Sequence, residues 1–279
     1  MTFDMSAAWR DATAMIRANT EVLMIIAGIF FFLPGVATGF AVPAIPPATM
    51  ADPERAAAAI TAFYGTWGWF YAIVLVLQMV GTLALLALLR GRGRPTVGEA
   101  MRAGAAGLLP AVGTFLLIAF GFGLVVMAAS LVIGALATAA GGAGALIGAL
   151  LALALLGLII VASVRLSLTT PVIAIDRVFN PLEVLRRSWR MTGGQTLRLF
   201  AFYLLLIVVY LVVVIVVGLL SGVLLLALGE LASVIASSLL SAMIGAGAAV
   251  ISVAVLAAVH RQLAGEPGPS GDRAAGNGD

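Results

Sequence analysis

Long stretches without a charged residue dominate the pattern of this chain. Five intervals lack Asp, Glu, Lys and Arg altogether, over residues 22–51, 56–89, 103–164, 199–229 and 231–260. An α-helix needs about 20 apolar residues to cross the ~30 Å hydrocarbon core of a bilayer. The third interval is long enough for two such helices, with a glycine-rich turn expected at 139–144. The pattern therefore predicts an all-α integral membrane bundle of six transmembrane helices, over 22–41, 66–89, 109–136, 145–167, 199–227 and 233–259.

Short, basic and amphipathic segments accompany these helices. We predict an N-terminal amphipathic interfacial helix over residues 1–21, with Trp9 on its apolar face and Asp11 on its polar face, and two more near 95–107 and 181–192. Such helices lie along the membrane–water interface. Each of them precedes a pair of spans. That order leaves two interpretations open, a threefold repeat or a shared demand for basic amphipathic helices.

The composition agrees with an integral membrane protein. Only 10% of the 279 residues are charged, against about 25% in a soluble domain. The chain contains no Cys and no Lys, which excludes disulfides, thiolate metal sites, Schiff-base lysines and P-loop lysines. No charge-free interval has an ionisable residue near its middle, and Gln78 is the most central polar side chain. Ion- and proton-coupled transport usually needs such an ionisable residue, so the pattern disfavours it.

The arginines predict the orientation across the membrane. With the N-terminus inside, fourteen of the fifteen fall on the cytoplasmic side, and only Arg55 lies outside. Short loops with this bias follow the positive-inside rule. We therefore predict a multi-pass protein of the bacterial inner (cytoplasmic) membrane with both termini in the cytoplasm, where residues 261–279 form a disordered tail rich in Gly and Pro. The loop between the second and third spans is anchored by Arg90, Arg92, Arg94 and Arg102.

The polar segment between the fourth and fifth spans is the candidate site. Pro171 is expected to end the fourth span, so that residues 171–176 run along the surface. Asn180 can then cap a helix, Pro181 suits its first turn, and Glu183 can bond back toward the cap. Arginines in such a helix serve as topology signals and interfacial anchors, or they form a site for anionic lipid headgroups. The headgroup hypothesis depends on Arg186, Arg187, Trp189, Arg190 and Arg198.

The same segment resembles a known group of membrane domains. TTPVIAID is followed by NPLEVLRRSWRMTGG and then by an aromatic-rich apolar run from Leu199. This order is similar to the glycerophosphoryl diester phosphodiesterase membrane domain and to the related YciC-like inner-membrane proteins. The resemblance implies a membrane domain alone, because the family name describes a domain found attached to the enzyme. The residues that carry it are Pro171, Asp176, Pro181, Glu183, Ser188, Trp189 and Gly193.

These observations favour a non-enzymatic polytopic membrane protein that acts in lipid or envelope homeostasis by binding lipids or proteins. A phosphodiesterase would need carboxylates and histidines around a divalent metal, and His260 is the only histidine. We expect His260 to be solvated or interfacial, and we expect no metal, cofactor or catalytic residue. The expected partners are membrane lipids, anionic ones above all, and a membrane-protein partner or a homo-oligomer, but no nucleic acid. The alternatives are a small-solute or lipid transporter or channel component and, more distantly, a membrane-embedded phosphodiesterase.

Overall fold

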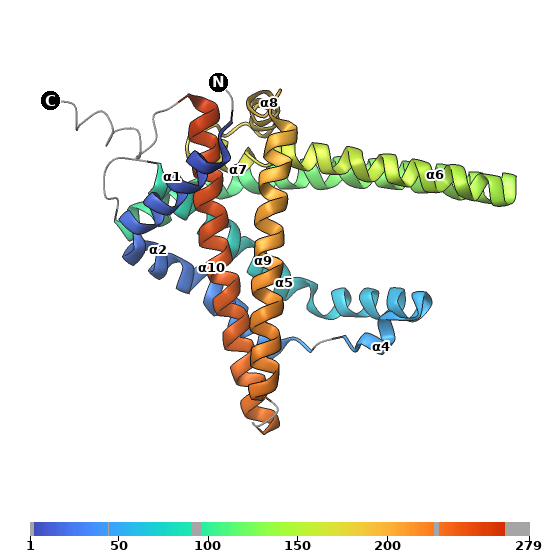
Figure 1. Cartoon of the computed structure of the whole chain (residues 1–279), viewed down its shortest axis with the longest axis horizontal. Helices are drawn as coiled ribbons and strands as arrows, with labels where there is room; N and C mark the ends of the chain where they lie inside the picture. The colour runs from blue at the N-terminus through green and yellow to red at the C-terminus, as the bar shows by residue number, and fades with distance from the viewer. Residues whose placement is uncertain (1–2, 44, 91–95, 226–228, 266–279) are drawn as a thin grey trace.

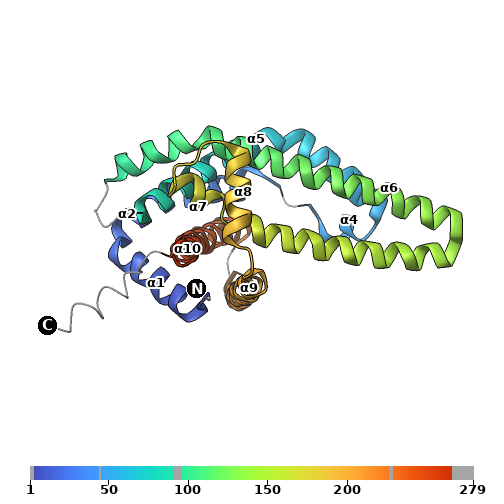
Figure 2. The ribbon, with the colours of Figure 1, turned by 90° about the horizontal axis from the view of Figure 1, so that it is seen from above.

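The computed structural model describes residues 3–43, 45–90, 96–225 and 229–265, and every regular element in that part of the chain is a helix (Figures 1 and 2). The predicted all-α class is confirmed for these residues. In chain order the elements are α1 (Met5–Ala18), α2 (Thr20–Ala27), the π-helix η1 (Gly28–Phe32), α3 (Leu33–Ala41), α4 (Pro47–Met50), α5 (Pro53–Leu89), α6 (Val97–Leu166), α7 (Thr169–Ala174), α8 (Pro181–Met191), α9 (Thr196–Leu225) and α10 (Glu230–Ala264).

Five helical stretches in the described residues are long and apolar enough to cross a membrane, namely Thr20–Ala41, Pro53–Leu89, Val97–Ala174, Thr196–Val223 and Leu231–Ala264. The third stretch includes α6, which reverses its direction at Gly141, where φ is 53° and ψ is −129°. Figure 2 shows the two antiparallel arms that result. The reversal lies inside the turn predicted at 139–144.

Glycine lets the two arms of α6 approach each other closely. A Cβ atom placed on Gly144 would overlap the carbonyl oxygen of Leu136, and one placed on Gly148 would come within 3.0 Å of Ile133 Cγ2. The backbone angles of Gly141 belong to a region that residues with a side chain rarely adopt. The glycines of this segment therefore both reverse the chain and allow the arms to pack side by side.

Helix α5 begins earlier than the hydrophobic pattern predicts, at Pro53 rather than at residue 66. The Asp52 carboxylate accepts hydrogen bonds from the backbone N–H groups of Glu54 (3.0 Å) and Arg55 (3.2 Å), and so caps the helix. Proline suits the first turn because its missing N–H would have no partner there. Four consecutive alanines follow Arg55 and favour helix. The local signals for helix thus extend beyond the predicted span.

The interfacial helix predicted near 95–107 is not a separate element. Thr96 Oγ1 accepts a hydrogen bond from Glu99 N (3.3 Å), and the Glu99 carboxylate accepts one from Thr96 N (2.9 Å). This capping box starts α6 at Val97, and the helix continues through Pro110. The basic segment and the third predicted span form one helix, because no residue between them ends it.

The buried core lies where the two ends of the described chain meet, and it includes Leu23, Ile26, Leu85, Ala254 and Ala258. Asp4 N donates to Gln262 Oε1 (3.3 Å), and Gln262 Nε2 donates to the Asp4 carbonyl oxygen (3.2 Å). The Asp4 carboxylate also caps α1, and its hydrogen bond with the Ser6 hydroxyl lowers the pKa of Asp4 below its ordinary value. The start of α1 and the end of α10 therefore lie at the same end of the molecule.

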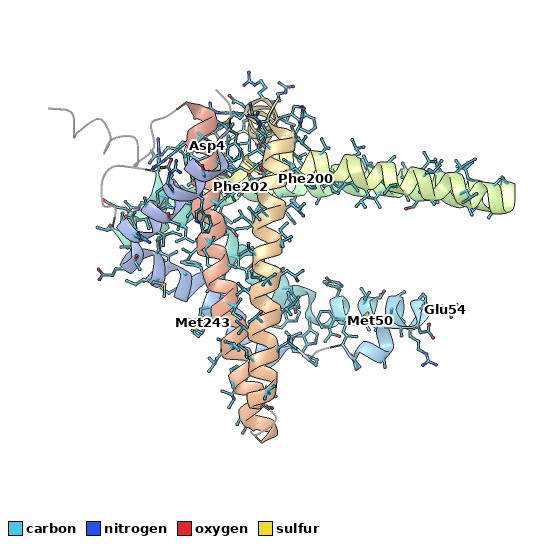
Figure 3. The ribbon with its side chains drawn as sticks, viewed as in Figure 1. Asp4, Met50, Glu54, Phe200, Phe202 and Met243 are labelled. Carbon is cyan, nitrogen blue, oxygen red and sulfur yellow. The ribbon has the colours of Figure 1, made fainter. Side chains whose placement is uncertain are left out.

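Two residues of helix α1 lie on the opposite side to the one that the sequence pattern predicts. Asp11 is only 4% exposed, whereas Trp9 is 43% exposed. Ala8 and Ala12 are buried, and their small side chains let α1 pack closely against α10. Phe3 adds an edge-on contact to Phe202 of α9, which Figure 3 labels, with ring centroids 5.6 Å apart. Helix α1 is thus a packed part of the fold, and the predicted positions of Trp9 and Asp11 on its faces are wrong.

The helical hairpins diverge from this common end. In Figure 1, α9 and α10 run down the page, whereas the α6 hairpin runs away from them to the right. No residue is buried in the most apolar part of Thr196–Val223, and Met243 of α10, labelled in Figure 3, is 60% exposed. Lipid tails are as apolar as these side chains, so no hydrophobic drive forces the helices together within a bilayer. The hairpins therefore do not close into the single bundle that the sequence predicts.

Candidate functional site

Helix α8 is the central element of the candidate site, and its ends follow from local sequence. Asn180 Oδ1 accepts a hydrogen bond from Leu182 N at 3.0 Å, and Pro181 occupies the first turn. Beyond the last turn, Gly194 adopts a left-handed φ of 78°. The predicted Asn180 cap is confirmed, and glycine follows the end of the helix. The bond from Glu183 back to the cap does not occur among the hydrogen bonds of the described residues.

Two buried hydroxyl groups dock α8 against the end of α6. Ser188 Oγ donates to the carbonyl oxygen of Arg165 at 2.8 Å, and Thr192 Oγ1 donates to the same oxygen at 3.2 Å. Both residues are fully buried. The last carbonyl groups of a helix have no partner within it, and these side chains satisfy one of them. Ser188 of the family-like motif therefore positions α8.

A cation–π contact orients Trp189 beside this junction. The Arg165 guanidinium lies 4.7 Å from the centre of the Trp189 ring, and Arg165 Nε donates to Thr196 Oγ1 at 3.3 Å. Trp189 nevertheless remains 42% exposed. Its ring is fixed from one side by the protein while much of its surface stays accessible, as is common for tryptophan at a membrane–water interface.

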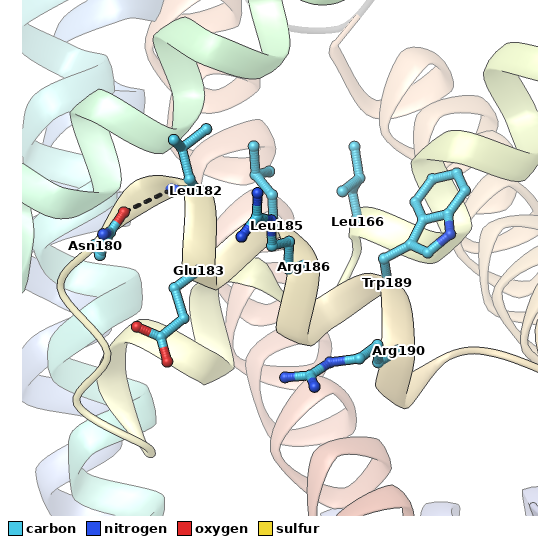
Figure 4. A pocket seen from close by; sticks show the side chains of 8 residues that line it. All are labelled: Leu166, Asn180, Leu182, Glu183, Leu185, Arg186, Trp189 and Arg190. Carbon is cyan, nitrogen blue, oxygen red and sulfur yellow. Dashed lines mark hydrogen bonds between the residues drawn. The ribbon is translucent and has the colours of Figure 1, made fainter.

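An open groove of about 750 Å³ runs along α8, lined by Leu166, Asn180, Leu182, Glu183, Leu185, Arg186, Trp189 and Arg190. Figure 4 shows the leucine side chains pointing to one side of the helix, and Glu183 and Arg190 pointing to the other. Glu183, Arg186 and Arg190 are exposed, and none of the three forms an ion pair with another described residue. The groove therefore combines an apolar wall with two guanidinium groups and one carboxylate, none of which has an ion-pair partner in the described part of the chain.

This arrangement suits a molecule with a phosphate at one end and hydrocarbon at the other. Arg186 and Arg190 are four residues apart and project from the same face of α8. Guanidinium groups bind phosphate oxygens through two parallel N–H donors, and leucine side chains can cover an acyl chain. Of the five residues in the headgroup hypothesis, Arg186, Trp189 and Arg190 line one groove.

Arg187 belongs to a different cluster, in which its own side chain remains 42% exposed while its partners are largely or fully buried. Its Nε lies 2.8 Å from Asp176 Oδ2, and the same oxygen lies 3.1 Å from His260 Nε2. His260 is fully buried, and the Asp176 side chain is 12% exposed. His260 Nδ1 is buried and has no hydrogen-bond partner within the described part of the chain. The expectation of a solvated or interfacial His260 is wrong, because the end of α10 lies within the core and faces the turn after α7. No group of three or more potential metal ligands occurs among the residues that the structure describes.

The remaining predicted anchors lie apart from the groove. Arg198 is exposed on the first turn of α9, and Arg90 is exposed just after α5. Arg102 lines a separate hollow of about 550 Å³ between α6 and the segment after α7. Arg92 and Arg94 fall outside the described residues. The arginines predicted as anchors therefore do not form one site in the structure.

Pro171 does not lead into a surface segment. It lies buried in α7, together with Val172, which packs against Leu83 of α5 and Ala111 of α6. The prediction that residues 171–176 run along the surface is wrong in this respect. The apolar side chains of this segment are covered by α5 and α6. Helix α7 is therefore buried, and α8 packs against it.

The comparisons with known proteins concern the fold as a whole. No curated protein matches the chain, and no solved structure matches it either. The profile of a family described as a domain of unknown function (DUF7847) matches residues 4–264. The matched range includes every helix from α1 to α10, and with them α8 and its groove. The chain belongs to the DUF7847 family.

Proposed function

We propose that this protein is a non-enzymatic protein of the bacterial inner membrane that binds anionic phospholipids at the α8 groove and acts in lipid or envelope homeostasis. We also propose six passes across the bilayer, with α6 counted as two, which leave both termini in the cytoplasm. This topology requires the α6 hairpin, which runs across the direction of α9 and α10 in Figure 1, to align with them in the membrane. This function is also what the resemblance to the phosphodiesterase membrane domain and the YciC-like proteins implies, and that resemblance stays a prediction. Membrane-protein partners or a second copy of the chain remain further proposed partners.

The single observation that carries this proposal is the pairing of free guanidinium groups with an apolar wall in one groove. Arg186 and Arg190 have no ion-pair partner among the described residues, while Leu166 and Leu182 line the same hollow. A basic pocket at the cytoplasmic surface is a known way to bind an anionic headgroup. Trp189 beside it suits the depth at which headgroups lie.

The distribution of arginine supports the proposed orientation. The start of α1 and the end of α10 lie together, and Phe3 N donates to Gln195 Oε1, just after α8, at 3.4 Å. If these segments face the cytoplasm, nearly all arginines do, as the positive-inside rule requires. The groove then faces the anionic leaflet.

The test is lipid binding by the Arg186→Gln/Arg190→Gln double variant, measured by native mass spectrometry with phosphatidylglycerol. Each arginine near an anionic surface contributes about 1 kcal/mol, so we expect the Kd to rise about 30-fold. Arg198→Gln is the matched control, because Arg198 is exposed nearby but does not line the groove. Unchanged binding in the double variant, or an equal loss in the control, would contradict the proposal.

Transport of a small uncharged solute or lipid is the second candidate function. Two hollows in the described part of the chain are lined by Gln78, and one of them also reaches Thr114. A transporter would need such a polar path through the apolar spans. Flux of uncharged solutes and fluorescent lipids into proteoliposomes, compared between the wild type and a Gln78→Leu/Thr114→Val variant, tests this candidate. Flux equal to that of protein-free liposomes would exclude it.

A further inference from the structure

Two hollows share one wall formed by Phe31, Leu75 and Gln78. The smaller one, about 290 Å³, lies between α5, α6 and α7 and also includes Thr114 and Thr170. The larger one, about 760 Å³, lies between α3, α5 and α10. Volumes of this size are typical of small-molecule sites, which range over about 300–1,000 Å³. Gln78 therefore lies between two hollows, each of which is large enough to hold part of a ligand.

The amide of Gln78 has no hydrogen-bond partner among the described residues, although its backbone carbonyl accepts a bond from Thr82. The Thr170 hydroxyl, in the smaller hollow, also lacks one, whereas Thr114 donates to the carbonyl oxygen of Pro110 at 2.8 Å. Gln78 lies ~16 Å from the end of α5 at the ~1.5 Å rise per helical residue. With that end at the membrane surface, as in the proposed topology, this is near the middle of the bilayer. Because hydrocarbon offers no hydrogen bonds, these two groups favour a polar occupant.

The lining of the hollows excludes a charged occupant. Neither hollow is lined by an acidic residue, an arginine or the histidine among the described residues, and the polar groups present are an amide and hydroxyls. Tyr64 and Tyr71 line the larger hollow, and Phe115 lines the smaller one. An ion or a phosphate would lose its hydration without gaining a counter-charge. An amide and hydroxyl groups instead match carbonyl and hydroxyl groups of an uncharged molecule.

The shared wall contains an unusual helical turn. Phe31 belongs to the π-helix η1, a wider turn than an α-helical one, and such turns often occur at functional sites. The ring of Phe31 also lies against Gly81 of α5, where a Cβ atom would come within 2.9 Å of Phe31 Cε2. The η1 turn therefore holds a large aromatic side chain between the two hollows.

We propose that the hollows around Gln78, here named the Gln78 chamber, bind an uncharged glycerolipid of the diacylglycerol kind. The Gln78 amide and the Thr170 hydroxyl hold its ester and hydroxyl groups. The hydrocarbon chains follow the apolar walls outward to the bilayer. This site is separate from the α8 groove and differs from it in lipid class, because the groove presents arginine and the chamber presents only neutral groups.

The experiment compares the full-length wild type with Gln78→Leu/Thr170→Val by native mass spectrometry with added diacylglycerol, and maps a photoactivatable diacylglycerol by peptide sequencing. We expect the double variant to lose at least about 10-fold in affinity, the equivalent of one to two lost hydrogen bonds. The photolabel should attach to the helices that line the chamber, namely α3, α5, α6, α7 or α10. The thermal stability of the delipidated protein should not fall, because the replaced groups have no partner among the described residues.

The controls separate this site from the α8 groove. Ser130→Ala is the matched control, since Ser130 is exposed on α6 and lines neither hollow. Arg186→Gln/Arg190→Gln should keep diacylglycerol binding while losing phosphatidylglycerol, and the chamber variant should show the reverse. Absence of diacylglycerol binding in the wild type, equal binding in the chamber variant, or labelling of α8 alone would each overturn the proposal.

Discussion

The carboxylate of Asp176 serves two partners from distant parts of the chain. One of its oxygens meets Arg187 of α8 and His260 of α10, at 2.8 and 3.1 Å. Asparagine keeps an oxygen that accepts hydrogen bonds but removes the negative charge, so both interactions weaken. A hydrogen bond to a charged group contributes about 1.5–3 kcal/mol, and the contribution on the Arg187 side is smaller because that side chain is 42% exposed. We expect Asp176→Asn to lower the free energy of unfolding in detergent by about 1–3 kcal/mol, as measured by chemical denaturation.

The matched control for this prediction is Asp52→Asn. Asp52 also pairs with an arginine, Arg55, at 3.4 Å, but both side chains are largely exposed. Exposed pairs contribute at most about 1 kcal/mol, and asparagine caps α5 as well as aspartate does. A similar loss of stability in both variants would contradict a structural role for the buried cluster.

At the scale of single residues, sequence reasoning identified side chains with local roles and missed those with distant partners. The Asn180 cap follows from the next few residues alone, and the structure contains it. His260 and Asp176 are 84 residues apart, and no periodicity links them. From sequence alone, a single histidine beside an arginine at the end of a helix is expected to lie at the membrane–water interface. Only the packing of α10 against the turn after α7 removes it from water.

At the scale of helices, the α6 hairpin depends on close contact between its arms. We expect Gly144→Ala to destabilise the hairpin, because a methyl group there would overlap the Leu136 carbonyl oxygen, and forced overpacking costs about 1–3 kcal/mol. The measurement is the thermal midpoint in detergent, together with the rate of proteolysis near the turn. Gly157→Ala is the control in the same helix, since nothing lies within 4 Å of its Cβ position.

The two substitutions should have opposite signs. Alanine in an open helical position is favoured over glycine by about 0.5–1 kcal/mol, so Gly157→Ala should leave the thermal midpoint unchanged or raise it. If Gly144→Ala were equally harmless, the two arms would not pack as described.

The charge-free intervals predicted the long apolar helices better than they predicted the ends and the packing of these helices. The long apolar stretches of the sequence coincide with long helices, as the composition of these stretches predicts. The start of α5 at Pro53 and the fusion of the basic segment with α6 depend on capping groups in short polar stretches. The burial of α7 depends on contacts with α5 and α6, which a single stretch of sequence does not contain.

At the scale of the whole molecule, the proposed topology can be tested with single cysteines, because the native chain has none. Cysteines at Thr49 and Gly142 should react with a membrane-impermeant maleimide added to intact cells stripped of their outer membrane. Cysteines at Gly194 and Gly265 should react only after lysis. The prediction follows from the positive-inside rule and from the shared position of the two ends of the fold. Labelling of Gly265→Cys from outside would reverse the orientation and remove the α8 groove from the cytoplasmic leaflet.

Helix α9 has a consequence for how this chain can vary. No side chain is buried along the most apolar part of α9, so neighbouring helices constrain its side chains weakly there, although Leu206 is partly buried against the core. Any apolar residue of suitable helix propensity can replace another at these positions, provided that the segment stays hydrophobic enough to insert into the membrane. A library randomised among Leu, Val, Ile and Phe along this helix should retain most of its members, and sequence drift should accumulate there faster than in the tightly fitted segments beside it.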